Sequence, residues 1–237
     1  MKKAVGFDQK ILLHQLDFIV KEIPFTDNRQ ELYQKLEEYL AADIAGSKSR
    51  LNARTIITKI WYRVDEEYRG LQQEGLELYS RLNLEERKAL HWGMILLAYP
   101  FFADVVKELG VSFRLQEEVP KIQLLRKIKS LYGDRRRVEV AFDAVIASIT
   151  AWGFLASKGN GLRQIAGDRI QVQTSELKRW LAEVLLRVLA VDYLPVETFN
   201  EHPVLFPFRF YSLIEELNCS RFNIIRQGVN MQVVCLR

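Results

Sequence analysis

Residues 121–152 constrain the fold of this chain more than any other stretch. A short basic helix is predicted over 121–132, because Pro120 precedes it and Gly133 follows it. Asp134 is the expected N-cap of a second, longer helix. Along that helix, apolar side chains alternate in steps of four and three and so form one stripe: Val138, Phe142, Val145, Ile149 and Trp152. The second helix must therefore bury this face against the rest of the protein.

The residues after the stripe predict a β-hairpin. Gly153 ends the second helix, and two extended runs flank the turn Ser157–Gly161: Phe154–Ala156, and a run that ends at Ile170–Val172. A helix, a short turn, a helix and a hairpin follow one another in this order in a winged helix-turn-helix. In that unit the second helix enters the major groove of a duplex, and the hairpin touches the backbone beside it. The sequence therefore predicts a winged helix-turn-helix-like unit in the middle of the chain.

Helices are also predicted before this unit. Two lie within residues 8–44, where Pro24 separates them and Thr26–Asn28 supplies N-cap side chains for the second. A polar loop is predicted at 46–49, followed by a third helix over about 52–68.

The later elements follow the same kind of pattern. Asn83, with Glu86 three residues on, is typical of a helix N-terminus, and Pro100 interrupts the apolar helix that follows. An amphipathic helix is predicted over 175–191 and another over about 208–218. A second hairpin is expected to close the chain, from residues 222–226 and 231–236 around Gly228.

Composition agrees with a folded, intracellular protein. Of 237 residues, 49% are hydrophobic and 27% charged. No window approaches about eighteen uncharged apolar residues, so no membrane span is expected. Asp8–Lys10 interrupts the apolar stretch of a secretory signal, and Cys219 and Cys235 are expected to be reduced, which makes the cytoplasm the expected location.

The expected fold class is mainly α: a helical bundle with a winged helix-turn-helix-like middle and short β-hairpins. Three regions are predicted. They are an N-terminal helical region (1–85), a winged-helix-like region (86–173) and a C-terminal region of helix plus hairpin (174–237).

Basic residues gather in two clusters. Lys plus Arg exceed Asp plus Glu by only 34 to 30, so the distribution of charge matters more than the net +4. In residues 121–137, seven basic residues accompany one acid, and three arginines open the longer helix, where the helix dipole also favours phosphate. In residues 48–63, five basic residues accompany no acid. The candidate nucleic-acid-binding residues are Lys48, Arg50, Arg54, Lys127, Lys129, Arg135, Arg136, Arg137, Lys158 and Arg163.

Two alternatives compete with nucleic-acid binding. The basic residues can form a merely solvated face on a structural winged helix. Glu139 and Asp143, on the exposed side of the longer helix, favour this, because acids repel phosphates, although a carboxylate can accept from cytosine N4. The alternative function is a protein-interaction adaptor, with the aromatic-rich residues 199–211 as its candidate docking surface.

No catalytic centre is recognisable in the sequence. The three histidines do not pair with another His, Cys or acid at metal-ligand spacing, and there is no Gly-rich phosphate loop or nucleophile elbow. We therefore expect no enzyme activity, no cofactor and no metal. One rival pattern is Asp168 followed by Glu176 and Lys178, which is typical of metal-dependent nucleases. However, Glu176 falls in the first turn of a predicted helix, where an acid simply favours the dipole.

Three segments in the middle of the chain resemble a known family. They are Ser47–Arg63, which begins Ser-Lys-Ser-Arg-Leu-Asn-Ala-Arg; Leu90–Met94, Leu-His-Trp-Gly-Met; and Asp134–Leu155, which ends Ala-Trp-Gly-Phe-Leu. Over residues 45–156 this pattern resembles the BrxA family of BREX phage-exclusion systems. The resemblance implies a small, helical, non-enzymatic protein associated with DNA, with contacts from basic residues near 48–54 and 135–137. About eighty further residues follow, which a short protein of that family would not need.

The expected function is therefore a non-catalytic nucleic-acid-binding accessory protein of a phage-defence system. Its expected partners are DNA or RNA and the proteins of a multi-component system, with no membrane.

Overall fold

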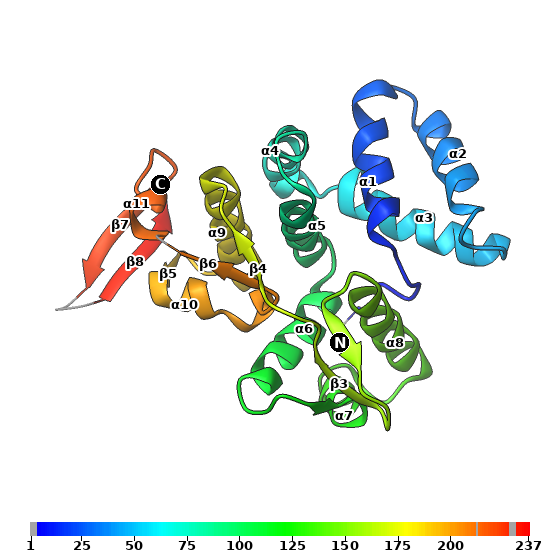
Figure 1. Cartoon of the computed structure of the whole chain (residues 1–237). Helices are drawn as coiled ribbons and strands as arrows, with labels where there is room; N and C mark the ends of the chain where they lie inside the picture. The colour runs from blue at the N-terminus through cyan, green and yellow to red at the C-terminus, as the bar shows by residue number, and fades with distance from the viewer. Residues whose placement is uncertain (1–3, 212, 228–230) are drawn as a thin grey trace.

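The computed structural model describes residues 4–211, 213–227 and 231–237, and these are mainly α-helical (Figure 1). The α-helices are α1 (Leu13–Glu22), α2 (Arg29–Leu40), α3 (Ser47–Trp61), α4 (Arg69–Tyr79), α5 (Leu84–Ala98), α6 (Pro100–Phe113), α7 (Lys121–Tyr132), α8 (Arg136–Ala151), α9 (Ser175–Leu189), α10 (Val196–Glu201) and α11 (Leu213–Leu217). The 3-10 helices are η1 (Ile23–Phe25), η2 (Glu66–Tyr68) and η3 (Pro203–Leu205). The strands are β1 (Val119–Pro120), β2 (Leu155–Ser157), β3 (Leu162–Ile165), β4 (Ile170–Val172), β5 (Tyr193–Pro195), β6 (Phe208–Phe210), β7 (Phe222–Gln227) and β8 (Met231–Leu236).

The first two predicted helices are confirmed, but the polar loop predicted after them is wrong. The Asn28 side chain caps α2 by accepting from the backbone N of Gln30 at 2.8 Å. The loop predicted at 46–49 exists only at Gly46, the N-cap of α3, because Ser47 already begins the helix. A serine or lysine in a first turn costs a helix little, so polar composition alone did not locate this boundary.

Helix α4 was not predicted, because its two glycines lower the helix propensity of the segment. Close packing explains why one of them is a glycine. A Cβ at Gly75 would lie 3.3 Å from the Trp61 ring, so this glycine lets α4 approach the end of α3 closely.

The predicted break at Pro100 is confirmed. Helix α5 begins after Asn83, whose side chain accepts from the backbone N of Glu86 at 2.9 Å, and α6 leaves it at a bend of 120°. Within the described residues no single helix is long and apolar enough to cross a membrane; α5 and α6 meet that test only as a bent pair.

Trp92 on α5 lies at the centre of the aromatic core. Its indole N donates to the carbonyl O of Val204 at 2.8 Å. Its ring contacts five others, which come from α6, the end of α8 and the C-terminal region: Phe102, Trp152, Phe154, Phe206 and Phe208. One core therefore joins the middle of the chain to its C-terminal part.

This packing corrects the docking surface expected at residues 199–211. Only Tyr211 among its aromatic residues is exposed; the other four are buried, at 0–5% exposure: Phe199, Phe206, Phe208 and Phe210. The aromatic residues gather there because they complete the core under Trp92.

The middle of the chain contains a small antiparallel sheet surrounded by three helices. In chain order the elements are α6, β1, α7, α8, β2 and β3, and the sheet order is β1-β3-β2. Leu155 pairs with Ile165, and Val119 pairs with Arg163. The predicted stripe is confirmed, since all five of its side chains are buried.

Two predictions fail just after this sheet. The second extended run stops at Ile165, and residues 170–172 form β4, which pairs in parallel with β6. The helix expected from residue 208 begins only at Leu213, because residues 208–210 supply that partner strand. A parallel pair between segments this far apart in the chain leaves no local periodicity to detect.

The C-terminal part packs on α5 through α9. A Cβ at Gly93 would lie 2.3 Å from the Trp180 ring, so the glycine is needed for α5 and α9 to meet. The last predicted hairpin is confirmed: β7 pairs antiparallel with β8 in a sheet of order β5-β8-β7. Its Gly228 turn lies outside the described residues.

Candidate nucleic-acid interface

The turn between α7 and α8 fixes where the basic residues point. Gly133, at φ +88°, ends α7, and Arg135 is the N-cap of α8. The guanidinium of Arg135 donates from Nε and Nη2 to the carbonyl O of Tyr132, at 3.2 and 2.9 Å. Asp134, the predicted cap, makes no capping bond; its carboxylate lies 2.8 Å from Lys129 Nζ. Arg135 therefore holds the turn together.

The next two arginines face solvent. The side chains of Arg136 and Arg137 are 86% and 65% exposed. Arg136 lies 3.3 Å from Glu139, and Arg137 lies 3.8 Å from Asp8. Exposed ion pairs of this kind contribute little to stability, so each arginine can exchange its carboxylate partner for another anion. These two guanidinium groups are the most accessible cations at the start of α8.

The lysines of α7 are more strongly engaged. Lys129 Nζ contacts both Asp134 and Glu139, and hydrogen bonds to these two acids raise its pKa. The hydrogen bond from Lys129 lowers the pKa of Glu139 in turn. Lys127 Nζ lies 3.2 Å from Glu108. Part of the basic cluster is thus neutralised within the protein.

The β2–β3 hairpin adds a cation beside these helices. Lys158 is exposed in the turn between the strands. Arg163 is half-buried, and its Nη1 donates to Ser157 Oγ at 3.1 Å, so it braces the hairpin. The backbone N of Lys121 donates to the carbonyl O of Gly161 at 2.9 Å, which joins the hairpin turn to the start of α7.

A hollow of about 400 Å³ shows that α7, α8 and the hairpin form one continuous surface. Its acids are not isolated: Asp143 lies 2.8 Å from Lys121 Nζ, and Glu139 contacts Lys129. The hollow is lined by Lys121, Ile122, Leu125, Arg136, Glu139, Val140, Asp143 and Gly161. The repulsion expected from Glu139 and Asp143 is therefore partly offset by neighbouring lysines.

The basic residues of α3 are arranged differently. Lys48 is exposed, whereas Arg50 donates to the carbonyl O atoms of Ile44 and Ala45 at 2.9 and 2.7 Å. Arg54 lies 2.6 Å from Glu37, and its guanidinium stacks 4.9 Å from the centre of the Tyr33 ring. Arg50 and Arg54 thus bind other parts of the protein.

The most deeply buried histidine belongs to a structural network. The Trp61 indole N donates to His91 Nδ1 at 3.1 Å, and His91 Nε2 lies 3.1 Å from Asp17. Burial lowers the pKa of His91, so the ring is neutral and Nε2 carries the proton. The Tyr79 hydroxyl donates to the same carboxylate at 2.6 Å. This network ties together α1, α3, α4 and α5.

The nuclease-like pattern of Asp168, Glu176 and Lys178 does not form a metal site in the described part of the chain. Within the described residues, no group of three or more His, Cys, Asp or Glu side chains is placed to hold a metal ion. Lys178 is buried and its Nζ lies 2.8 Å from Glu216, whereas Glu176 is exposed in the first turn of α9. Lys178 is therefore engaged in attaching α11 to α9.

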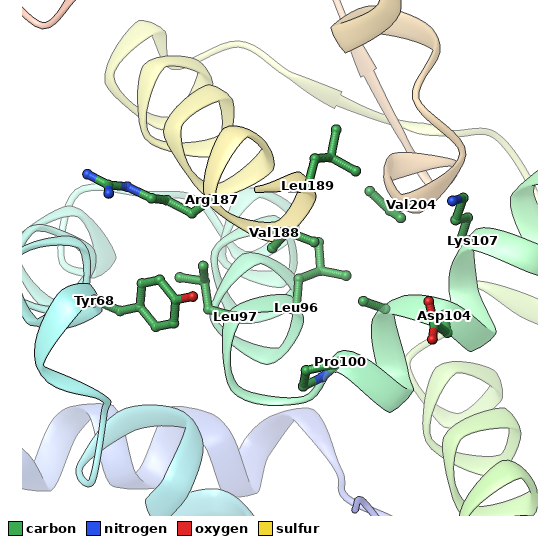
Figure 2. Close-up of a pocket in the computed structure, with 11 residues that line it drawn as sticks. Tyr68, Leu96, Leu97, Pro100, Asp104, Lys107, Arg187, Val188, Leu189 and Val204 are labelled. Carbon is green, nitrogen blue, oxygen red and sulfur yellow. The ribbon is translucent and has the colours of Figure 1, made fainter. Parts of the chain in front are cut away.

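A second hollow, of about 280 Å³, lies where the α5–α6 bend meets the end of α9 (Figure 2). Figure 2 shows Leu96 and Val188 at its centre, while the guanidinium of Arg187 extends away from them. Arg187 pairs with Glu183 at 3.3 Å. Ligand sites usually have polar groups that converge on them, and here the charged Arg187 points elsewhere.

Comparisons of the chain with known protein families, curated proteins and solved structures found no match.

Two basic residues of this candidate interface were absent from the sequence-based candidates. Lys121 lines the hollow, and Arg126 is exposed on α7. The signal was available, since both belong to the cluster at 121–137. The contact between Arg137 and Asp8 had no such signal, because it joins segments far apart in the sequence.

Proposed function

We propose that the protein is a non-catalytic accessory protein that binds duplex DNA through a winged helix-turn-helix formed by residues 100–165. The order α6-β1-α7-α8-β2-β3 and the sheet order β1-β3-β2 support this, because a winged helix-turn-helix has this succession and pairing. In this proposal α8 is the recognition helix and the β2–β3 turn is the wing.

The observation that carries the proposal is the position of the exposed cations. Arg136 and Arg137 occupy the first turn of α8, and Lys158 lies in the hairpin turn. The free N–H groups and the dipole at a helix N-terminus favour phosphate in the same place. Such contacts supply most of the affinity of a protein for nucleic acid.

Duplex DNA is the proposed partner rather than RNA. A B-form major groove admits a helix such as α8, whereas the major groove of an RNA duplex is too deep and narrow for side chains to read. The resemblance of residues 45–156 to BrxA supports a place in a phage-defence system.

The proposal is tested by fluorescence anisotropy with a labelled duplex at low and physiological salt, with tRNA as competitor. We expect micromolar or tighter binding with a steep salt dependence. Changing Arg136, Arg137 and Lys158 together to Ala removes three phosphate contacts and lowers the slope of log K against log salt by about 2.7. Arg135 stays, because it bonds the Tyr132 carbonyl and its loss would disturb the turn.

A control variant changes Lys21, Arg69 and Arg81 to Ala, three exposed residues outside the unit and outside both basic clusters. It removes the same charge and is expected to keep most of the affinity. Binding that survives the Arg136/Arg137/Lys158 variant contradicts the assigned interface. No binding at low salt contradicts the function, and a nuclease-resistant protein partner in a pull-down then favours the adaptor alternative.

A further inference from the structure

The exposed face of α8 carries a feature that phosphate binding does not explain. Resting on the proposed function, we infer that Asp143 makes DNA binding sequence-selective. Its carboxylate repels phosphates at most sites and accepts a hydrogen bond from a base amino group, cytosine N4 or adenine N6, where one faces it. The substrate class is thus duplex DNA with such an amino group at one fixed position in the major groove.

The geometry places Asp143 on the face that would enter the groove. Arg136, Val140 and Asp143 follow one another at steps of four and three, so they share one side of α8. All three are exposed, at 86%, 39% and 58%. The buried stripe lies on the other side of the helix, so this is the face that a recognition helix would present.

The chemistry of this face suits base edges better than a bare backbone. An ionised carboxylate only accepts hydrogen bonds, so among base edges it selects for an amino donor. Val140, with Ile122 at 56% exposure beside the same hollow, offers apolar contact to a thymine methyl group. A surface that bound only phosphate would gain nothing from these apolar residues.

Asp143 also disfavours binding to duplexes that lack the matching amino group. Asp143 lies 2.8 Å from Lys121 Nζ, at the start of α7, where Lys121 can reach a phosphate instead. On a duplex without the matching amino group, the carboxylate loses its contact with Lys121 and gains no partner. Discrimination of this kind needs a repulsive element as well as an attractive one.

The experiment selects bound duplexes from a randomised library with the wild-type chain and with Asp143→Ala. For the wild type, we expect an enriched motif with cytosine or adenine fixed at one position. The variant is expected to lose the preference at that position alone. Its ratio of affinities for the selected and a scrambled duplex should fall about tenfold, partly because it binds the scrambled duplex more tightly.

Asp27→Ala is the matched control, because it makes the same change of charge in the loop between α1 and α2, away from α8 (Figure 1). It should leave the motif unchanged. Identical motifs for the wild type and Asp143→Ala, or equal binding of all duplexes by both, overturn the inference and leave the proposed function standing. A wild-type chain that binds no duplex overturns both.

Discussion

The two basic clusters of the sequence differ in what their arginine side chains contact. In α3, Arg50 and Arg54 bind carbonyl and carboxylate groups of the same protein. At the start of α8, Arg136 and Arg137 remain largely exposed and contact acids only at 3.3 and 3.8 Å. The cluster with no acid in its own sequence is therefore the one whose arginines are more fully satisfied internally.

The reason lies in partners outside each cluster. Glu37 on α2 faces Arg54 across a helix pair, and the turn after α2 offers unpaired carbonyl groups to Arg50. Arg136 has its partner, Glu139, on the same helix, and Arg137 has Asp8 at 3.8 Å in the N-terminal segment. Because both arginine side chains are largely exposed, these pairs compete only weakly with solvent. The number of basic residues in a stretch of sequence thus gives the local charge, but it does not show whether those side chains are free to bind a partner.

The largest effect is expected from removing the arginines of α3. Arg50→Ala with Arg54→Ala leaves two carbonyls and one carboxylate without their donors, so the free energy of unfolding should fall by about 2–3 kcal/mol. Urea unfolding measures this loss. Duplex affinity, measured below the unfolding transition, should change less than about twofold, which is the reverse of the Arg136/Arg137/Lys158 variant.

Lys48→Ala is the control for that experiment, because Lys48 is exposed on the first turn of the same helix. It should leave the free energy of unfolding unchanged. A large loss of affinity in the Arg50/Arg54 variant, with stability retained, would break the comparison and make α3 part of the interface.

A change of pH is expected to separate stability from binding. Burial, followed by the charges of Lys107 and Arg114, lowers the pKa of His202 from its usual 6.5 to about 4. Burial also lowers the pKa of His91. The unfolded chain therefore takes up protons below pH 6.5 that the folded chain does not, and the free energy of unfolding falls as the pH drops from about 6.5 towards 4.

The loss should reach roughly 1–2 kcal/mol by pH 5 in urea titrations. His202→Asn keeps a side-chain acceptor for the backbone N of Val204 and should make the dependence shallower. At the interface, the pKa of Lys129 is raised and that of Glu139 lowered, so both stay charged. Duplex affinity should therefore be constant from pH 8 to 6, and a parallel fall of affinity would contradict this separation.

Several signals that depend on neighbouring residues were informative. The caps at Asn28 and Asn83, the break at Pro100 and the buried stripe of α8 all depend on residues within a few positions of one another. Those positions were predicted correctly.

Local signals also failed at the 46–49 loop, at α4 and at the Asp134 cap, whereas two other failures depend on distant residues. The parallel pair of β4 with β6 depends on residues about forty positions apart. Residues 208–210, which were predicted to begin a helix, form the second strand of this pair. For the interface, the sequence supplied the basic residues of α7, α8 and the hairpin. It did not distinguish the exposed Arg136 from Arg135, whose guanidinium bonds the Tyr132 carbonyl in the turn. Which of the two faces solvent depends on the direction of the chain after Gly133.

The smallest expected effect tests whether internal acids restrain the interface. Glu139→Gln removes the charge that holds Lys129 and Arg136, so both cations become more available to phosphate. Duplex affinity should rise about threefold at low salt, and the gain should shrink at high salt because it is electrostatic. Glu85→Gln is the matched control, since Glu85 holds Lys88 at 2.9 Å in the same way on α5. An equal gain from both variants would mean that only the net charge matters, whereas a gain from Glu139→Gln alone would show that the position of the released cations decides binding.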